Sequence, residues 1–444
     1  MSTDALRTAL TDVLPGARAD LEALVRMPSI SADPERARDV QAAAETVADL
    51  AGDAGAADVQ IVDAGGRPAV IATWPAPAGA PTVLLYAHMD VQPTGPLEEW
   101  TSPPFEPTER AGRLYGRGAA DDKAGVLMHL AVLRAFGGKP PVGVVLFIEG
   151  EEEIGSPTLT ALLAQHHDVL RSDVIVIADS GNAAVDVPAF TTSLRGLVDL
   201  YVEVRLLERP VHSGVFGGPI GDALTGLCRM LATLHDDLGN VAIKGLHLGT
   251  SDAPDIDPVV FRAGAGLLDG AELIATGSLP ERLWHHPAVS VLGIDAPSTA
   301  DASNVLLPRA RAKVSLRIAP GDDAARAEHA LVEHLQAHAP WGAEVVVTPG
   351  STGEPFALET TGDVYDVARA AFAEAYGNEA VEMGIGGSIP FIAEFARAYP
   401  GATVLVTGVG DPASRWHGID ESLDLAMWQR ACLAELLLLS RLAP

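Results

Sequence analysis

The chain reads Val83-Leu84-Leu85-Tyr86-Ala87-His88-Met89-Asp90 where a short apolar run meets a histidine and an aspartate. The continuous apolar run at 83–86 predicts a strand that is buried on both faces, as in a helix-covered parallel sheet. In open α/β sheets, ligands bind beyond the carboxyl ends of the strands. We therefore expect His88 and Asp90 at the edge of a sheet where a ligand site forms.

Further apolar runs have the same texture, at residues 144–148, 174–177 and 404–406. Residues 4–54 are rich in helix formers, and a helix is also expected at 124–136, between the apolar runs at 83–86 and 144–148. The fold class predicted from these patterns is α/β, with a helix-covered, largely parallel catalytic sheet.

The middle of the chain has a different pattern. Apolar and polar residues alternate at 198–206 and 312–318, and the second run is followed by a helical stretch at 322–339 and an apolar run at 344–347. Period-two strands with one wet face predict an antiparallel sheet backed by helices. We expect an inserted α+β domain at 190–352, acting as a lid or in dimerisation, between catalytic parts at 1–189 and 353–444.

Composition bounds the class of protein. The 444 residues carry a net charge of −29, which would repel nucleic acid. The chain has two distant cysteines and begins without the pattern of a signal peptide, so a cytoplasmic location is expected. The apolar stretch near 433–439 is too short to cross a membrane, and no membrane partner is expected.

Acidic residues and histidines recur just past the apolar runs. The segments are Tyr86-Ala87-His88-Met89-Asp90, Gly116–Lys123, Glu149–Ser156, Ala178-Asp179-Ser180 and Trp416-His417-Gly418. Each segment alone could have a purely structural role: Asp122 could merely cap the following helix, and the glutamates could line a solvated loop. Their joint presence predicts one site.

Carboxylate and imidazole ligands suit zinc, manganese or cobalt, and a shared carboxylate can bridge two such ions. The ions would activate a water and polarise a carbonyl, leaving a nearby glutamate to take the proton. Asp90 could accept the second ring proton of His88 and so orient it. These roles describe the hydrolysis of an amide. Motifs of single-zinc proteases, nucleophile elbows and phosphate-binding loops do not occur in the sequence.

The order and spacing of the segments resemble the dinuclear zinc peptidases, the family of carnosine dipeptidases, aminoacylases, glutamate carboxypeptidases, acetylornithine deacetylases and succinyl-diaminopimelate desuccinylases. The resemblance implies that His88 and Asp179 hold one metal, that Glu153 and His417 hold the other, and that Asp121 bridges both. It also implies that Glu152 is the general base, that Asp90 supports His88, and that the Asp121-Asp122 peptide bond is cis. Because Glu151 is also present, a shift of the base by one position stays open.

Residues of the middle region are candidates for substrate binding. The segment from His212 to Gly218 resembles the His-Ser-Gly segment of the dipeptidase branch, where the histidine stabilises the oxyanion, either from a partner subunit or from a closing lid. Arg317, on the polar face of its strand, and Asn304 could bind a carboxylate. Gly387 and Ser388 resemble a family turn that would hold the same carboxylate.

We therefore predict an enzyme that hydrolyses dipeptides or similarly small substrates with a free carboxylate, using two divalent ions. Zinc is the expected metal, with manganese or cobalt as alternatives, and a homodimer through the inserted domain is expected. A deacylase of N-acyl amino acids needs the same groups and is the alternative. A non-catalytic metal-binding protein of the same fold is the second alternative.

Overall fold

The computed structural model describes residues 3–251, 253–386 and 390–444. The chain forms two compact units, which we call the first unit (Met1–Thr192, Glu359–Glu382 and Ile389–Pro444) and the second unit (Ser193–Leu358 and Met383–Ser388). The predicted limits of an inserted domain at 190–352 stay a prediction, because compactness alone does not define a separately folding domain. In the described ranges, no helix has the length and apolar character that crossing a bilayer requires.

The first unit is built on a six-stranded sheet, which runs in the order β1-β2-β6-β3-β7-β17. The four strands β6, β3, β7 and β17 are parallel, whereas β1 and β2 are antiparallel to their neighbours. Their bounds are β1 Asp58–Val62, β2 Ala69–Trp74, β3 Thr82–His88, β6 Gly143–Glu149, β7 Val174–Ile177 and β17 Thr403–Val406. The predicted largely parallel sheet and its apolar strands are confirmed.

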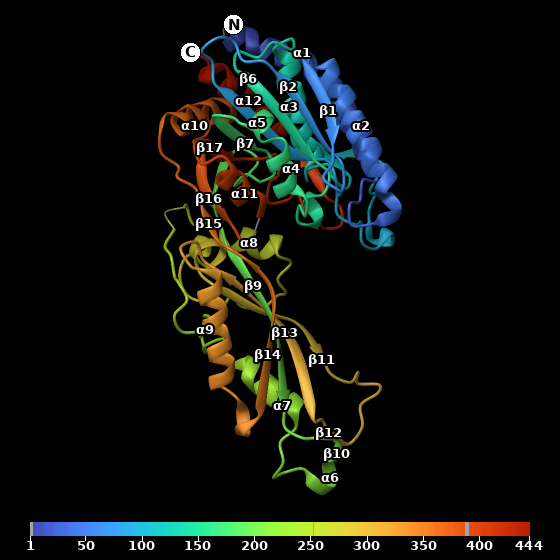
Figure 1. Ribbon diagram of the computed structural model, residues 1–444, viewed down its shortest axis with the longest axis vertical. Helices are drawn as coiled ribbons and strands as arrows, with labels where there is room; N and C mark the ends of the chain where they lie inside the picture. The colour runs from blue at the N-terminus through green and yellow to red at the C-terminus, as the bar shows by residue number, and fades with distance from the viewer. Residues whose placement is uncertain (1–2, 252, 387–389) are drawn as a thin grey trace. The chain divides into compact units, whose positions relative to one another are not determined.

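Helices cover both faces of this sheet, as Figure 1 shows. One face packs on α1 (Thr3–Val25), α2 (Ala37–Asp53), α3 (Lys123–Ala135), α10 (Asp363–Tyr376) and α12 (Leu425–Leu442). The other face meets α4 (Leu159–Gln165), α5 (His167–Leu170) and α11 (Pro390–Ala398), where Phe395 contacts Tyr86 and Phe147. Burial on both faces explains why these strands are continuously apolar.

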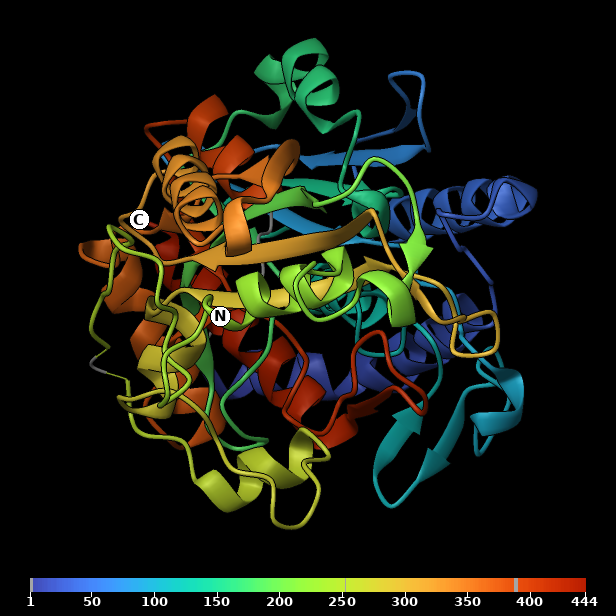
Figure 2. The ribbon, with the colours of Figure 1, turned by 90° about the horizontal axis from the view of Figure 1, so that it is seen from below.

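The chain also forms two small three-stranded sheets. One has the order β18-β5-β4, from Ser422–Asp424, Arg113–Tyr115 and Thr108–Arg110. The β4–β5 hairpin is drawn in teal in Figure 2. The other has the order β15-β8-β16, from Phe356–Ala357, Ala189–Leu194 and Val381–Ile385.

The second unit contains an antiparallel sheet in the order β11-β13-β9-β14. The strands are β11 Ala288–Asp295, β13 Arg309–Ile318, β9 Gly196–Arg205 and β14 Glu344–Gly353. Alternate residues of β9 and β13 pack with α7 (Ala223–Ala232) and α9 (Ala324–Ala337) in a separate apolar core. The period-two pattern thus correctly indicated one helix-covered face.

One end of the second unit carries β10 (Val211–His212), α6 (Ser213–Phe216) and β12 (Val305–Leu306), which are labelled together in Figure 1. Among the described residues between 240 and 290, the structure forms α8 (Pro258–Gly264) and a π-helical turn at Glu281–His285.

Candidate active site

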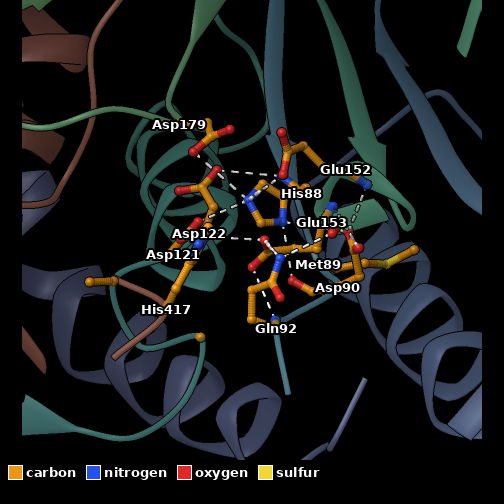
Figure 3. Close-up of polar contacts among 12 residues, drawn as sticks. His88, Met89, Asp90, Gln92, Asp121, Asp122, Glu152, Glu153, Asp179 and His417 are labelled. Carbon is orange, nitrogen blue, oxygen red and sulfur yellow. Dashed lines mark hydrogen bonds and ion pairs between the residues drawn. The ribbon is translucent and has the colours of Figure 1, made fainter. Parts of the chain in front are cut away.

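His88 ends β3, and its ring is fully buried. Its Nε2 lies 3.1 Å from Asp121 Oδ1, 3.8 Å from Asp179 Oδ1 and 4.0 Å from Glu152 Oε2. Figure 3 shows these side chains pointing toward one another from separate segments of the chain. The parallel strands explain the meeting, because β3, β6 and β7 all end at the same edge of the sheet.

Asp121 lies between two histidines. Its Oδ1 faces His88, and its Oδ2 lies 3.1 Å from His417 Nε2. The same nitrogen of His417 lies 3.2 Å from Glu153 Oε2. Asp121 therefore separates His88 and Asp179 on one side from His417 and Glu153 on the other.

The peptide bond between Asp121 and Asp122 is cis, which confirms that expectation. Asp122 precedes α3, but its side chain makes no capping hydrogen bond to the helix. Its Oδ2 instead accepts the backbone N–H of His88 at 3.3 Å. The alternative in which Asp122 merely caps a helix is therefore wrong, because its carboxylate binds the backbone at the end of β3 and not the N–H groups of the helix.

The three adjacent glutamates after β6 have different surroundings. Glu151 is buried, and its carboxylate accepts the backbone N–H groups of Arg67 and Thr158, each at 2.8 Å. Glu152 instead directs its carboxylate to within 4.0 Å of His88 Nε2. This arrangement favours Glu152 over Glu151 as the base, since Glu151 is occupied by structural bonds.

Asp90 connects two segments of the site. Its carboxylate accepts the backbone N–H groups of Glu152, at 3.2 Å, and Glu153, at 3.1 Å. His88 Nδ1 is 3.1 Å from the backbone carbonyl of Asp90 and 3.5 Å from its carboxylate. The backbone carbonyl is thus the nearer partner of the ring, and the orienting role of the carboxylate stays a prediction.

The donor set fits divalent cations. One ligand atom from each of His88, Asp121 and Glu153 lies within 4.8 Å of the others, and the same holds for His88, Glu152 and Asp179. In the part of the chain that the structure describes, no lysine or arginine forms an ion pair with these carboxylates. Buried carboxylates at this density need a cationic partner, which supports the predicted metal site.

The pKa values reflect this crowding. Burial, followed by the charge of Asp121, raises the pKa of Glu153 to about 7. Burial and the charge of Asp179 also raise the pKa of Glu152 well above its usual range. Hydrogen bonds to Asp121 and Glu153 raise the pKa of His417 to about 10. The site therefore holds more carboxylate charge than its two imidazoles neutralise.

Sequence reasoning missed two supporting residues. The Gln92 side chain donates to Glu153 Oε2 at 2.8 Å and to the Glu153 carbonyl at 3.0 Å. Glu421 is buried against Arg117 at 2.7 Å, and its carboxylate accepts the backbone N–H of Asp121 at 3.1 Å. Gln92 stands two residues after Asp90 in an already suspected segment, whereas no local pattern singles out Glu421.

The candidate residues of the second unit fall into two places. His212 pairs with Val305 between β10 and β12, and the N–H of Ser213 donates to the Asn304 carbonyl at 3.0 Å. His212 and Asn304 are thus neighbours, and both are exposed. Arg317 lies near the C-terminal end of β13, whereas β12 precedes the N-terminal end of that strand. Gly387 and Ser388 lie outside the described residues.

The separation of these places limits what one chain can do. From Arg309 to Arg317, β13 runs for eight residues, or about 26 Å at about 3.3 Å per residue. An extended dipeptide spans about 7 Å. His212 pairs with Val305, which precedes Arg309 in the chain, and Figure 1 shows β10 and β12 beyond that end of β13. His212 and Arg317 of one chain therefore cannot contact the same dipeptide.

Comparison with known proteins gives the family. Residues 84–440 match the model of "Peptidase family M20/M25/M40". The chain belongs to this family. It is a metallopeptidase, and the resemblance predicted from the sequence, including its dipeptidase branch, is confirmed.

Relatives in the family are named as dipeptidases. The "Cysteinylglycine-S-conjugate dipeptidase" of Corynebacterium striatum is 38% identical over 363 residues, which are 80% of each chain. The human "Beta-Ala-His dipeptidase" is 29% identical over 348 residues, covering 73% of this chain and 68% of the relative. The "Cys-Gly metallodipeptidase dug1" of Schizosaccharomyces pombe is 27% identical over 364 residues, 78% and 76% of the two chains.

Solved structures share the fold. Human carnosine dipeptidase 1 has a TM-score of 0.82 at 24% identity, covering 100% of this chain and 99% of its own. Dug1p of Saccharomyces cerevisiae has a TM-score of 0.81 at 22% identity, covering 100% and 98%. The likeness extends over both units, so the predicted fold class is confirmed.

Proposed function

We propose that this metallopeptidase hydrolyses the amide bond of dipeptides with a free carboxylate, by means of a dinuclear metal site. The observation that carries the proposal is the meeting of His88, Asp121, Glu153, Asp179 and His417 beside Glu152. The names of the relatives support a dipeptide over an N-acyl amino acid as substrate.

We assign one metal to His88 and Asp179, the other to Glu153 and His417, and the bridging position to Asp121. The two carboxylate oxygens of Asp121 face the two histidines, which supports the bridging assignment. Two divalent ions, zinc in our proposal, would polarise the substrate carbonyl and lower the pKa of a water toward neutrality.

Glu152 has the position of a general base. Its side chain is 18% exposed and its carboxylate lies 4.0 Å from His88 Nε2, so a water can reach it beside the ligand cluster. We assign to Glu152 the proton of the attacking water and its delivery to the leaving amine nitrogen. Asp90 fixes the backbone of Glu152 and Glu153, because its carboxylate accepts both of their N–H groups.

We assign the substrate carboxylate to Arg317, with Gly387 and Ser388, and the oxyanion to His212, with Asn304 beside it. Because His212 and Arg317 of one chain are too far apart for one dipeptide, the assignment requires His212 from a partner subunit. The edge strand β11 supports a homodimer through the second unit, since Val291, Leu292 and Ile294 expose 41%, 56% and 44% of their surface.

A cytoplasmic location is also part of the proposal. Its support is the free state of both cysteines, Cys228 and Cys432, which fits a reducing compartment.

A substrate panel tests the activity. Purified, zinc-loaded protein is given Cys-Gly, β-Ala-His and other unblocked dipeptides, and in parallel their N-acetylated forms and N-succinyl amino acids. We expect hydrolysis of the unblocked set, abolished by a chelator and restored by added metal. A preference for the acylated set would replace the dipeptidase assignment with the deacylase.

Glu152→Gln tests the base. The change keeps the size of the side chain but removes the proton acceptor, so kcat should fall by about 10²–10⁴-fold. Metal content, measured by elemental analysis, should stay at the wild-type value because Glu152 is not an assigned ligand. If the variant keeps wild-type kcat with full metal content, Glu152 is not the base. If metal-loaded wild type hydrolyses nothing in the panel, the non-catalytic alternative is favoured.

A further inference from the structure

A polar hollow of about 300 Å³ lies in the first unit, at the small sheet β18-β5-β4. Its walls carry three guanidinium groups, two aliphatic hydroxyls and one phenol against a single carboxylate. The lining residues are Thr101, Arg110, Arg113, Tyr115, Ala413, Arg415, Asp420 and Ser422. None of them belongs to the catalytic assignments above.

The sheet places like charges together. Arg110 and Arg113 are directly opposite each other in the β4–β5 hairpin, while Leu114 between Arg113 and Tyr115 is buried in the core. Like charges directly opposite on neighbouring strands are destabilising. Each of the two arginines also has a carboxylate partner, Asp420 for Arg110 and Asp411 for Arg113, which offsets this repulsion.

The three arginines differ in how much of their hydrogen-bonding capacity is used. Arg113 is held by Asp411 at 2.7 Å and by Ser422 Oγ at 2.9 Å, and it also lies 3.8 Å from Asp424, so its position is fixed. Arg110 donates to Ser102 at 2.7 Å and lies 3.7 Å above the ring of Tyr115, with one nitrogen 3.8 Å from Asp420. Much of the Arg110 fork remains available.

Arg415 has the greatest free capacity. Among the described residues, it has no hydrogen bond or ion pair through its side chain, and it is exposed. The one carboxylate on the wall, Asp420, is already bound by the N–H of Thr101 at 3.0 Å and the Thr101 hydroxyl at 2.7 Å. Asp411 and Asp424 pair with Arg113, and Asp420 pairs with Arg110. Within the described ranges, Arg415 is therefore the arginine of the hollow whose guanidinium fork has no ion pair, and this fork is suited to an oxyanion.

The same loop carries a proposed metal ligand. The N–H of Gly418 donates to the Arg415 carbonyl at 2.8 Å, which closes a turn around His417. Arg415, His417 and Asp420 have φ angles of +56°, +58° and +58°, a region that non-glycine residues rarely adopt. Fixing Arg415 and Asp420 from the hollow would hold both sides of this turn and so the position of His417.

We propose that this hollow binds a tetrahedral oxyanion, an inorganic phosphate or sulfate or the phosphate of a monoester, through Arg110 and Arg415. The bound anion stabilises the turn that presents His417 and thereby raises the affinity of the active site for metal. The anion site itself does not depend on the proposed function, whereas its effect on metal affinity rests on His417 being a ligand.

Sulfate is the first probe, because it needs no peptide substrate. Sulfate is titrated calorimetrically into the full-length, zinc-loaded protein, with chloride at equal ionic strength as the reference. We expect saturable binding that weakens at least tenfold in Arg415→Gln and in Arg110→Gln. Arg38→Gln, at an exposed arginine without a described ion pair, is the matched control and should bind as the wild type. Absence of saturable binding, or wild-type affinity in both pocket variants, overturns the proposal.

Further titrations identify the anion. Tighter binding of phosphoserine or glycerol phosphate than of inorganic phosphate identifies a monoester as the ligand, and equal binding identifies the free anion; either supports the site. Tighter binding of acetate than of all tetrahedral anions would overturn the proposed class.

The coupling to His417 has its own measurement. Zinc affinity is determined by competition with a chelator, with and without saturating sulfate. Sulfate should tighten zinc binding by about fivefold or more in the wild type and not in Arg415→Gln. Unchanged zinc affinity in the wild type would overturn the coupling and leave an uncoupled anion site, an outcome distinct from failure of the dipeptidase assay.

Discussion

At the scale of single residues, two glycines make room for the indole next to His417. A Cβ placed on Gly410 or on Gly181 would overlap the ring of Trp416. Gly181 follows Asp179 by two residues, so the contact of Trp416 with Gly181 connects the loop of His417 with the loop of Asp179. Van der Waals contact alone can thus fix the distance between His417 and Asp179.

Gly410→Ala should therefore damage the site. The added methyl group displaces Trp416 from its contact with Gly410, and because the indole is 41% exposed we expect the loop of His417 to shift. We expect weaker zinc binding and at least a tenfold loss of kcat/KM, measured on the best dipeptide from the panel. Gly401→Ala is the control, because its Cβ would meet no atom within 4 Å. Equal kcat/KM in the two variants would contradict this role of Trp416.

The residues that sequence reasoning found and missed differ in kind. His88 and Asp179 directly follow apolar strands, so local pattern and sheet geometry together indicate them. Glu421 acts through the backbone N–H groups of residues about 300 positions away. Such a contact depends on the tertiary fold alone, and the surrounding sequence has no pattern that encodes it.

At the scale of elements, strands buried on both faces were predictable and exposed ones were not. Continuous apolar runs predict burial on both faces, and the residues of β3, β6, β7 and β17 in these runs are buried. β11 is mostly exposed, with only Val289 fully inside, so neither a continuous nor a strictly alternating pattern marks it. Pairing with β13, not local sequence, makes this segment a strand.

The N-terminus of α7 provides a test at this scale. Asp222 accepts the backbone N–H groups of Leu224, Thr225 and Leu307, so it both caps the helix and holds the chain after β12. Asp222→Ala should lower the free energy of unfolding of the second unit by about 2 kcal/mol, the upper end for an N-cap.

Asp323→Ala is the matched comparison for this prediction. Asp323 caps α9, where the one backbone N–H that its side chain accepts among the described residues is that of Arg326, so its loss should be about 1 kcal/mol. Both losses in the free energy of unfolding are measured by denaturant unfolding, monitored through hydrogen exchange of backbone amides in the second unit. A loss in Asp323→Ala that equals or exceeds that in Asp222→Ala would show that the contact to Leu307 adds nothing.

At the scale of the whole molecule, the proposed site needs two chains. His212 pairs with β12, which precedes the first residue of β13, whereas Arg317 lies near the last residue of that strand, so more than the length of a dipeptide separates them. The strand β11 offers an apolar edge for a second copy. A closed two-fold dimer would give each active site a histidine from the neighbouring chain.

Mixing two inactive variants tests this arrangement. His212→Ala and Glu152→Gln are each expected to be inactive, but a mixed dimer contains one site with an intact Glu152 and an intact His212. After denaturation and joint refolding at equal amounts, activity should return to about a quarter of the wild-type value, because half the dimers are mixed and each has one good site. Activity no higher than that of the separately refolded parents would mean that His212 does not act across subunits.

The central claim is that the five converging residues hold two cations. Its most direct test is an anomalous difference map from crystals grown with zinc and measured on both sides of the zinc absorption edge. The account predicts two peaks, about 3.5–4 Å apart, one beside His88 and Asp179 and one beside Glu153 and His417, with Asp121 between them. A map with no peak at these side chains under saturating zinc, or with zinc bound only elsewhere, would contradict it.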